Sequence, residues 1–303
     1  LGIVGGVAAT LGLGVPLVSA MIATLFEVED SMLIKISVLA FWTALFGTSV
    51  YKGLKAGIKI LADINVVLAI FAILFVLVAG PGVFILDLTV NSFGLMFSNF
   101  MSTATWTDPI REGDFPEAWT GFYWAWWFAY TGMVGLFFGR ISRGRTIRQL
   151  VLGVITWGCI GTWLFLAVMG GYSLFLEKTG ALAVTEILNS QGMSFLNALV
   201  IKSLPFGKIT LAIFTVLSII FYATTIDSSA YVISSICAKD LENTQEPRRW
   251  NRITWAVLLA LITAGLLQAD SLQTTLSMTV VSSLPMVPIL ILPVSYTHLT
   301  LPT

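Results

Sequence analysis

The sequence predicts an all-α membrane protein, and three observations support this prediction. The 303 residues are 57% hydrophobic and 11% charged, with a mean hydropathy of +0.91, which is far more apolar than a soluble domain. Eight apolar segments recur along the chain, most of them near the length of about 20 residues that crosses a bilayer as a helix. Their polar connections alternate in charge. The net charge is zero and indicates no nucleic-acid partner.

The expected membrane spans follow one another with mostly short connections. The connections after the second, fourth and sixth spans hold 11 of the 16 Lys and Arg residues, Arg252 among them. Because basic loops stay in the cytoplasm, these connections orient the chain. Residues 90–105 and 181–204 have partial helical periodicity and are expected to lie along the outer membrane interface. The spans are about 3–26, 32–51, 60–88, 119–139, 149–174, 207–237, 253–268 and 272–293.

The fourth span is unusually aromatic. Ten of the 21 residues from Trp119 to Gly139 are Phe, Trp or Tyr. At about 100° per residue, Trp119, Tyr123, Trp126, Trp127 and Tyr130 fall within roughly one third of the helix circumference. The negative faces of such rings attract ammonium groups, so the stripe suits a cationic ligand. Helix packing or an aromatic belt at the membrane interface is the alternative explanation.

The aromatic span continues into a basic cluster, FYWAWWFAYTGMVGLFFGRISRGRTIRQLVLG. This run resembles the signature of the betaine/carnitine/choline transporter family. Further similarity lies in LGLGVPL (11–17), GIKILADINVVLA (57–69) and FYATTIDSSA (221–230). The resemblance implies an inverted five-helix-repeat transporter fold, incomplete here, with about eight transmembrane helices corresponding to the family's fifth to twelfth spans.

The same resemblance divides the chain into four parts. Residues 1–88 are the remaining helices of the first repeat, 89–118 an extracytoplasmic interfacial segment, and 119–293 the second repeat. Residues 294–303, VSYTHLTLPT, are expected to be a non-native tail. The resemblance also implies a homotrimer in the cytoplasmic membrane of a prokaryote, and not an enzyme.

The expected cargo is a quaternary ammonium compound such as glycine betaine, choline or carnitine. By resemblance, Trp126 and Trp127 face its trimethylammonium group, and Tyr130 is a third aromatic residue on that face. Trp119 and Trp124 match outer aromatic residues on the access path.

The resemblance also implies a coupling ion but no cofactor. Phe221, Thr224 and Thr225 match the position where two hydroxyls and a carbonyl bind sodium, and hard oxygen donors suit such a cation. Alternatively, both hydroxyls bond back to the preceding helical turn. Asn65 also favours sodium coupling, because the family's sodium-independent antiporters have arginine there.

Two further comparisons bear on the number of coupling ions. Val134 stands where the antiporters have methionine, which again favours a sodium symporter. Ile3 and Val7, however, replace threonines that present a second sodium site in some members. A sodium-independent carnitine/betaine precursor–product antiporter is the alternative function.

Charged residues near the spans have open roles. Asp227 lies inside a span, where a charge needs a partner, and either tunes the sodium site or bonds the backbone of a neighbouring helix. Four arginines after the aromatic span set its topology, or form a gating loop or an anionic-lipid site. They are Arg140, Arg143, Arg145 and Arg148. A membrane enzyme is disfavoured because no cluster of catalytic residue types appears in the spans, and a channel or sensor is the remaining class.

Overall fold

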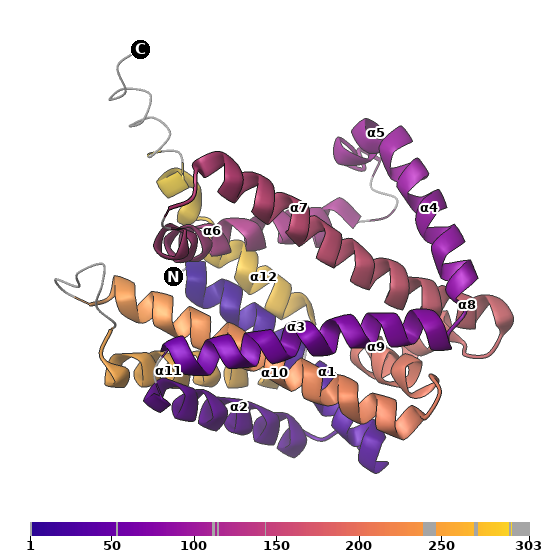
Figure 1. Ribbon diagram of the computed structural model, residues 1–303, viewed down its shortest axis with the longest axis horizontal. Coiled ribbons are helices and arrows are strands. Elements are labelled where there is room, and N and C mark those ends of the chain that lie inside the picture. The colour runs from indigo at the N-terminus through magenta and orange to yellow at the C-terminus, as the bar shows by residue number, and fades with distance from the viewer. Residues whose placement is uncertain are drawn as a thin grey trace.

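A computed structural model describes residues 2–52, 54–110, 113, 115–142, 144–238, 247–269, 272–290 and 292. This part of the chain is helical and contains no strand (Figure 1). The helices are α1 Gly2–Phe26, α2 Met32–Lys52, α3 Leu54–Ala79, α4 Gly82–Ser98, α5 Phe100–Ala104, α6 Gly121–Ile141, α7 Ile147–Phe165, α8 Gly171–Thr179, α9 Val184–Lys202, α10 Gly207–Ile236, α11 Arg249–Gln268 and α12 Leu272–Ser283, with π-helical turns η1 Pro116–Thr120 and η2 Leu166–Gly170.

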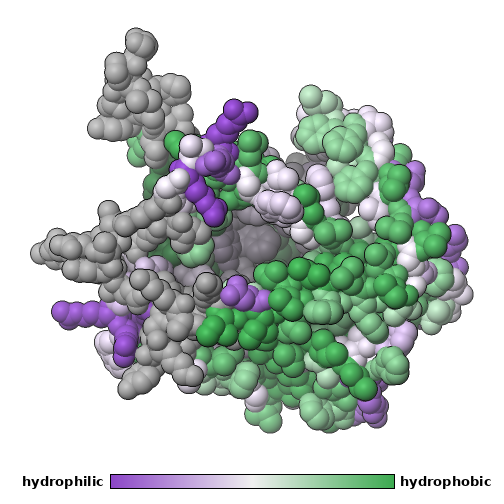
Figure 2. All heavy atoms as spheres, in the orientation of Figure 1, coloured by the Kyte–Doolittle hydropathy of each residue, from purple (hydrophilic) through white to green (hydrophobic). Residues whose placement is uncertain are grey.

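The predicted all-α membrane class is confirmed. Five helical stretches in the described residues are long and apolar enough to cross a bilayer: Gly2–Phe26, Ala62–Ala79, Ile147–Thr179, Gly207–Ile236 and Arg249–Gln268. Figure 2 shows a broad hydrophobic surface over α3 and the adjoining part of α10. On α3, large side chains such as Phe71 and Val78 are exposed there, as expected of a surface that contacts lipid.

Helix α1 is the central element of the fold. In its most apolar stretch 61% of the residues are buried, against at most 39% in the other four candidate spans. It packs against α6, α9, α10, α11 and α12. Small residues permit these approaches. A Cβ on Gly14 would lie 2.4 Å from the Tyr222 ring of α10. Tyr222 in turn packs on the fully buried Trp42 of α2, with ring centroids 5.2 Å apart.

Two hydrophobic clusters meet on α10. The first joins α1, α2 and α11 to the later half of α10, through Ala223, Ile226 and Ile233. The second joins α3, α8 and α9 to its earlier half, through Leu211 and Phe214. Helix α10 therefore connects both halves of the interior.

The expected third span, 60–88, is wrong in extent because the helix breaks inside it. Helix α3 ends at Ala79 and α4 begins at Gly82, with Gly80 and Pro81 between them. Proline lacks the backbone N–H that would continue the ladder, and its ring disfavours a helical residue before it. Helices α4 and α5 lie at the edge of the molecule (Figure 1).

The segment 181–204, expected along the outer membrane interface, forms helix α9, whose second half is buried against other helices. Its position relative to the membrane stays a prediction. Helix α9 is kinked at Gly192, which has φ 83° and ψ 171°. Beyond the kink, Leu196, Ala198 and Ile201 are buried, and α9 packs against α1. Glycine adopts this positive φ without steric cost, so the kink turns the apolar second half inward.

An ion cluster at the end of α1 makes acid stability a testable property. The Glu27 carboxylate lies 2.9 Å from Lys208 Nζ and 3.8 Å from Lys202 Nζ. The Lys208 hydrogen bond, then its charge and that of Lys202, lower the pKa of Glu27 below its ordinary 4.5. A lowered pKa stabilises the fold above about pH 4.5, and this contribution is lost as pH falls through the folded value.

We therefore expect Glu27→Gln to reduce the fall in melting temperature between pH 6 and pH 3.5, by a small amount because the pair is exposed. Glu29→Gln, an exposed neighbour outside the salt bridges of the described chain, is the control. An identical melting profile for Glu27→Gln and the unmodified protein would refute the assignment.

Candidate functional site

The aromatic residues of η1 and α6 form a continuous ladder. Ring centroids are 6.2 Å apart for Trp119 and Tyr123, 6.1 Å for Tyr123 and Trp126, and 5.9 Å for Trp126 and Tyr130. Phe122 stacks on Trp126 at 5.6 Å. Residues three and four apart are neighbours on a helix, which explains why the sequence spacing alone produces this ladder.

Tyr130 anchors the ladder to α1. Its hydroxyl lies 2.8 Å from Thr10 Oγ1, and Thr10 Oγ1 donates to the Gly6 carbonyl at 2.9 Å. Because the Thr10 proton is already used, Tyr130 is the donor of the first bond. A Cβ on Gly6 would lie 3.0 Å from the Tyr130 ring, so glycine allows the close approach. Tyr130 therefore has a packing role as well as its predicted place on the ligand face.

The prediction that Trp127 shares the ladder face is wrong. Its side chain is 65% exposed, and it belongs to none of the aromatic pairs among the described residues. Trp127 follows Trp126 by 100°, which turns it off the ladder and away from α1. Trp124 is 62% exposed and pairs with Phe128 at 5.9 Å. Helix α6 thus carries a packed ladder on one side and exposed indole rings on another.

The predicted sodium residues lie on one turn of α10. Thr224 Oγ1 donates to the Phe221 carbonyl at 2.7 Å, and Thr225 Oγ1 donates to the same carbonyl at 3.2 Å. Both hydroxyls therefore bond back to the preceding turn, while their oxygen lone pairs remain available. On α3, which packs against α10, the Asn65 side-chain oxygen is buried without a hydrogen-bond partner in the described part of the chain.

A buried ion pair that the sequence did not reveal lies beyond this turn. Arg252 Nη2 of α11 donates to Asp227 Oδ1 of α10 at 3.0 Å, and the two side chains are 1% and 2% exposed. Arg252 was expected in a cytoplasmic loop, but α11 begins at Arg249 and places it inside the helix. An unpaired ionised residue at mid-membrane costs about 2.5–3.5 kcal/mol on insertion scales, which explains why Asp227 has a charged partner.

The arginine cluster forms the α6–α7 connection. Arg145 and Arg148 are exposed; Arg143 and the side chain of Arg140 lie outside the described residues. Thr146 and Gln149 form a capping box that begins α7. A capping box provides hydrogen-bond acceptors for backbone N–H groups that the first helical turn leaves free. The cap therefore fixes the end of the loop at Thr146 and the start of α7 at Ile147.

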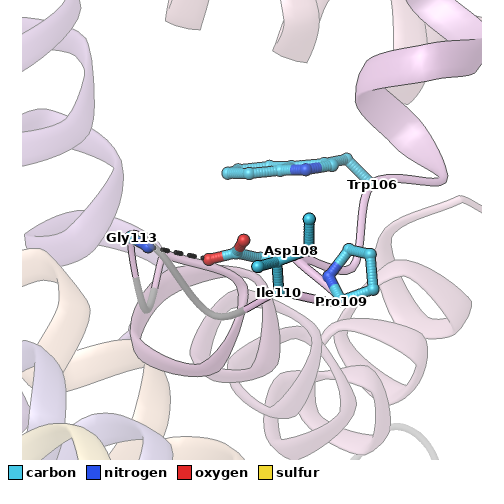
Figure 3. A pocket seen from close by; sticks show the side chains of 5 residues that line it. All are labelled: Trp106, Asp108, Pro109, Ile110 and Gly113. Atoms are coloured by element: carbon cyan, nitrogen blue, oxygen red, sulfur yellow. Dashed lines mark hydrogen bonds between the residues drawn. The ribbon is translucent and has the colours of Figure 1, made fainter.

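Sequence reasoning also missed a pocket before η1. It has a volume of about 510 Å³ and is lined by Trp106, Asp108, Pro109, Ile110 and Gly113. The Asp108 carboxylate accepts a hydrogen bond from Gly113 N at 2.9 Å, and Figure 3 shows the Trp106 indole above that carboxylate. The Trp106 ring stacks on Phe115 at 6.5 Å, directly before η1.

Comparison with known proteins decides the family. The model for "BCCT, betaine/carnitine/choline family transporter" matches residues 1–301. The chain belongs to this family. Together with its apolar helices, membership confirms the predicted helical fold of a membrane transporter family, and the similar proteins given below are named as transporters and not as enzymes. The match extends into residues 294–303, which lie outside the described residues, and the non-native tail stays a prediction.

Individual BCCT relatives are similar along most of this chain. A carnitine transporter of Acinetobacter baumannii is 31% identical over 273 residues, covering 90% of this chain and 50% of the relative. A high-affinity choline transport protein of Escherichia coli is 33% identical (94% and 42%), and a glycine betaine transporter of Acinetobacter baylyi is 32% identical (96% and 44%). The chain therefore spans about half the length of these relatives.

Proposed function

We propose that this BCCT sequence belongs to a sodium-coupled symporter that imports a quaternary ammonium compound by alternating access. The observation that carries the proposal is the exposed indole of Trp127 beside the α6 ladder. An exposed indole face attracts a methylated cation. The packed rings of the ladder hold α6 in place and so position the Trp127 indole. The relatives' names, which specify carnitine, choline and glycine betaine, support this cargo class.

Three oxygens on α10 support sodium as the coupling ion. The Thr224 and Thr225 hydroxyls converge on the Phe221 carbonyl. The Asn65 side-chain oxygen, on the adjoining α3, is buried without a hydrogen-bond partner in the described part of the chain, and it is of the hard donor type that sodium prefers. Inward sodium movement supplies about 2.3 kcal/mol per 100 mV of membrane potential, which is enough to drive accumulation.

We further propose a homotrimer in the cytoplasmic membrane of a prokaryote. The named relatives are bacterial. The exposed Arg145 in the α6–α7 connection and Arg148 in the first turn of α7 suit an anionic lipid headgroup or a gating partner.

Uptake of labelled betaine, choline and carnitine tests the function. The complete reading frame is expressed in cells that lack such transporters, and uptake is measured in sodium and in potassium buffer. Accumulation that needs sodium supports the symporter. Counterflow that persists without any ion gradient would instead support the precursor–product antiporter, which Asn65 and the threonine pair disfavour.

Removing the hydroxyls tests the ion site. We expect Thr224→Ala combined with Thr225→Ala to raise the half-saturating sodium concentration by about tenfold or more, since two ligands are lost. Substrate KM at saturating sodium should change little. Thr162→Ala is the matched control, because that exposed threonine on α7 also bonds back to the preceding turn. An unchanged sodium response in the double variant would remove the site from these residues.

A further inference from the structure

The Asp227–Arg252 pair is set among groups that fix its geometry. The guanidinium of Arg252 lies over the Tyr231 ring, with Cζ 5.4 Å from the centroid. Tyr231 is 8% exposed and lies one helical turn after Asp227 on α10. Arg252 thus contacts two successive turns of α10, through a charge-assisted hydrogen bond and a cation–π contact.

Stability alone is a weak explanation for a buried ion pair. Replacing a buried ion pair with apolar residues of similar volume is often neutral or stabilising, because the burial of two charges offsets their attraction. The surrounding positions are already apolar: Ile226, Ala230 and Ala256 are buried in the same cluster. The pair is therefore better explained by the orientation it imposes on α10.

The stretch of α10 around Asp227 is rich in hydroxyl groups that bond to the backbone. Four successive hydroxyls bond back to backbone carbonyls: Thr224 and Thr225 to Phe221, Ser228 to Thr224, and Ser229 to Thr225. Hydroxyls that bond back in this way compete with the helix ladder and often bend a helix. Helix α10 is continuous here, but these bonds favour bending in the stretch that contains Asp227.

Helix α11 is suited to hold that stretch of α10. It packs against α1 and α2 as well as α10, and Ala256 and Leu259 of α11 are buried with Val15 of α1 and Trp42 of α2. We infer that the Asp227–Arg252 pair is a positioning clamp that holds the Phe221–Thr225 turn against the frame of α1, α2 and α11. The inference rests on the proposed function, since that turn carries the proposed sodium oxygens.

Variants that remove charge singly and in pairs test the clamp. In the complete protein, Arg252→Met or Asp227→Asn alone should lower the folded amount, because each leaves a buried charge or polar group without its partner. The apolar pair Asp227→Leu with Arg252→Met should restore the folded amount and the melting temperature. Even so, its half-saturating sodium concentration should rise about tenfold, the effect typical of groups that orient metal ligands. Substrate KM at saturating sodium should stay unchanged.

A conservative variant and a control complete the design. Arg252→Lys keeps the positive charge but loses the planar guanidinium group. This variant should therefore fold and still raise the half-saturating sodium concentration. If the apolar pair variant fails to fold, the sodium response of Arg252→Lys tests the clamp instead. Arg248→Met removes an exposed arginine one turn earlier and should leave the sodium response unchanged.

The outcomes separate the two proposals. Folded apolar-pair or lysine variants with a normal sodium response would overturn the clamp and leave the symporter intact. Sodium-independent uptake by the unmodified protein would overturn sodium coupling, and the clamp's role with it.

Discussion

Replacing Trp127 with leucine is expected to raise the KM for quaternary ammonium substrates by about tenfold and to leave the protein folded. A cation–π contact contributes about 0.5–2 kcal/mol, and 1.4 kcal/mol corresponds to a factor of ten in affinity. The Trp127 ring is 65% exposed and outside the ladder, so its loss removes little packing. Concentration-dependent uptake and the melting temperature are measured together.

Two further variants make the result specific. Trp127→Tyr keeps an aromatic face and should recover most of the affinity. Trp157→Leu removes a comparably exposed indole from α7, 74% exposed, and should leave KM unchanged. If Trp127→Leu transports with normal KM, the exposed rings of α6 face lipid and the cargo assignment loses its main support.

Replacing Gly14 with alanine is expected to destabilise the fold by overpacking the contact between α1 and α10. The added Cβ would lie 2.4–2.7 Å from three atoms of the Tyr222 ring. That ring cannot move away easily, because it packs on the fully buried Trp42. Overpacking of this kind costs about 1–3 kcal/mol, so the melting temperature in detergent should fall by several degrees.

The control is a glycine in open surroundings. Gly158 of α7 has no heavy atom within 4 Å of the position that its Cβ would take. Gly158→Ala should keep or slightly raise the melting temperature, since alanine favours a helix by about 0.5–1 kcal/mol over glycine. Equal melting temperatures for the two variants would mean that α1 and α10 are farther apart than described.

Local features of the fold could be predicted from sequence, whereas pairings between distant segments could not. Apolar runs indicated the helices, and the aromatic spacing predicted the contacts of Trp126 with Tyr130. The Gly80–Pro81 pair signals a break, but the apolar run continues through it, so hydropathy alone predicts one long span. Helical periodicity placed Trp127 on the same face as Trp126 and Tyr130. Periodicity gives the angle between side chains, but it does not show which side of α6 packs against other helices.

The partner of Asp227 required the fold itself. Arg252 is 25 residues away along the chain and lies shortly after Arg248 and Arg249. In sequence all three resemble a basic loop. In the structure α11 begins at Arg249, and Arg252 is buried whereas Arg248 and Arg249 are exposed. The same holds for Thr10 and Tyr130, which are 120 residues apart.

The bond between these two residues has a mechanical consequence. If α6 swings relative to α1 during transport, it must first release the Tyr130 hydroxyl from Thr10. A single neutral hydrogen bond contributes about 0.5–1.5 kcal/mol, less than the work available from one monovalent cation crossing a membrane held at 100 mV, about 2.3 kcal/mol. This hydrogen bond therefore orients α6 on α1, and on its own it is too weak to prevent the two helices from moving apart.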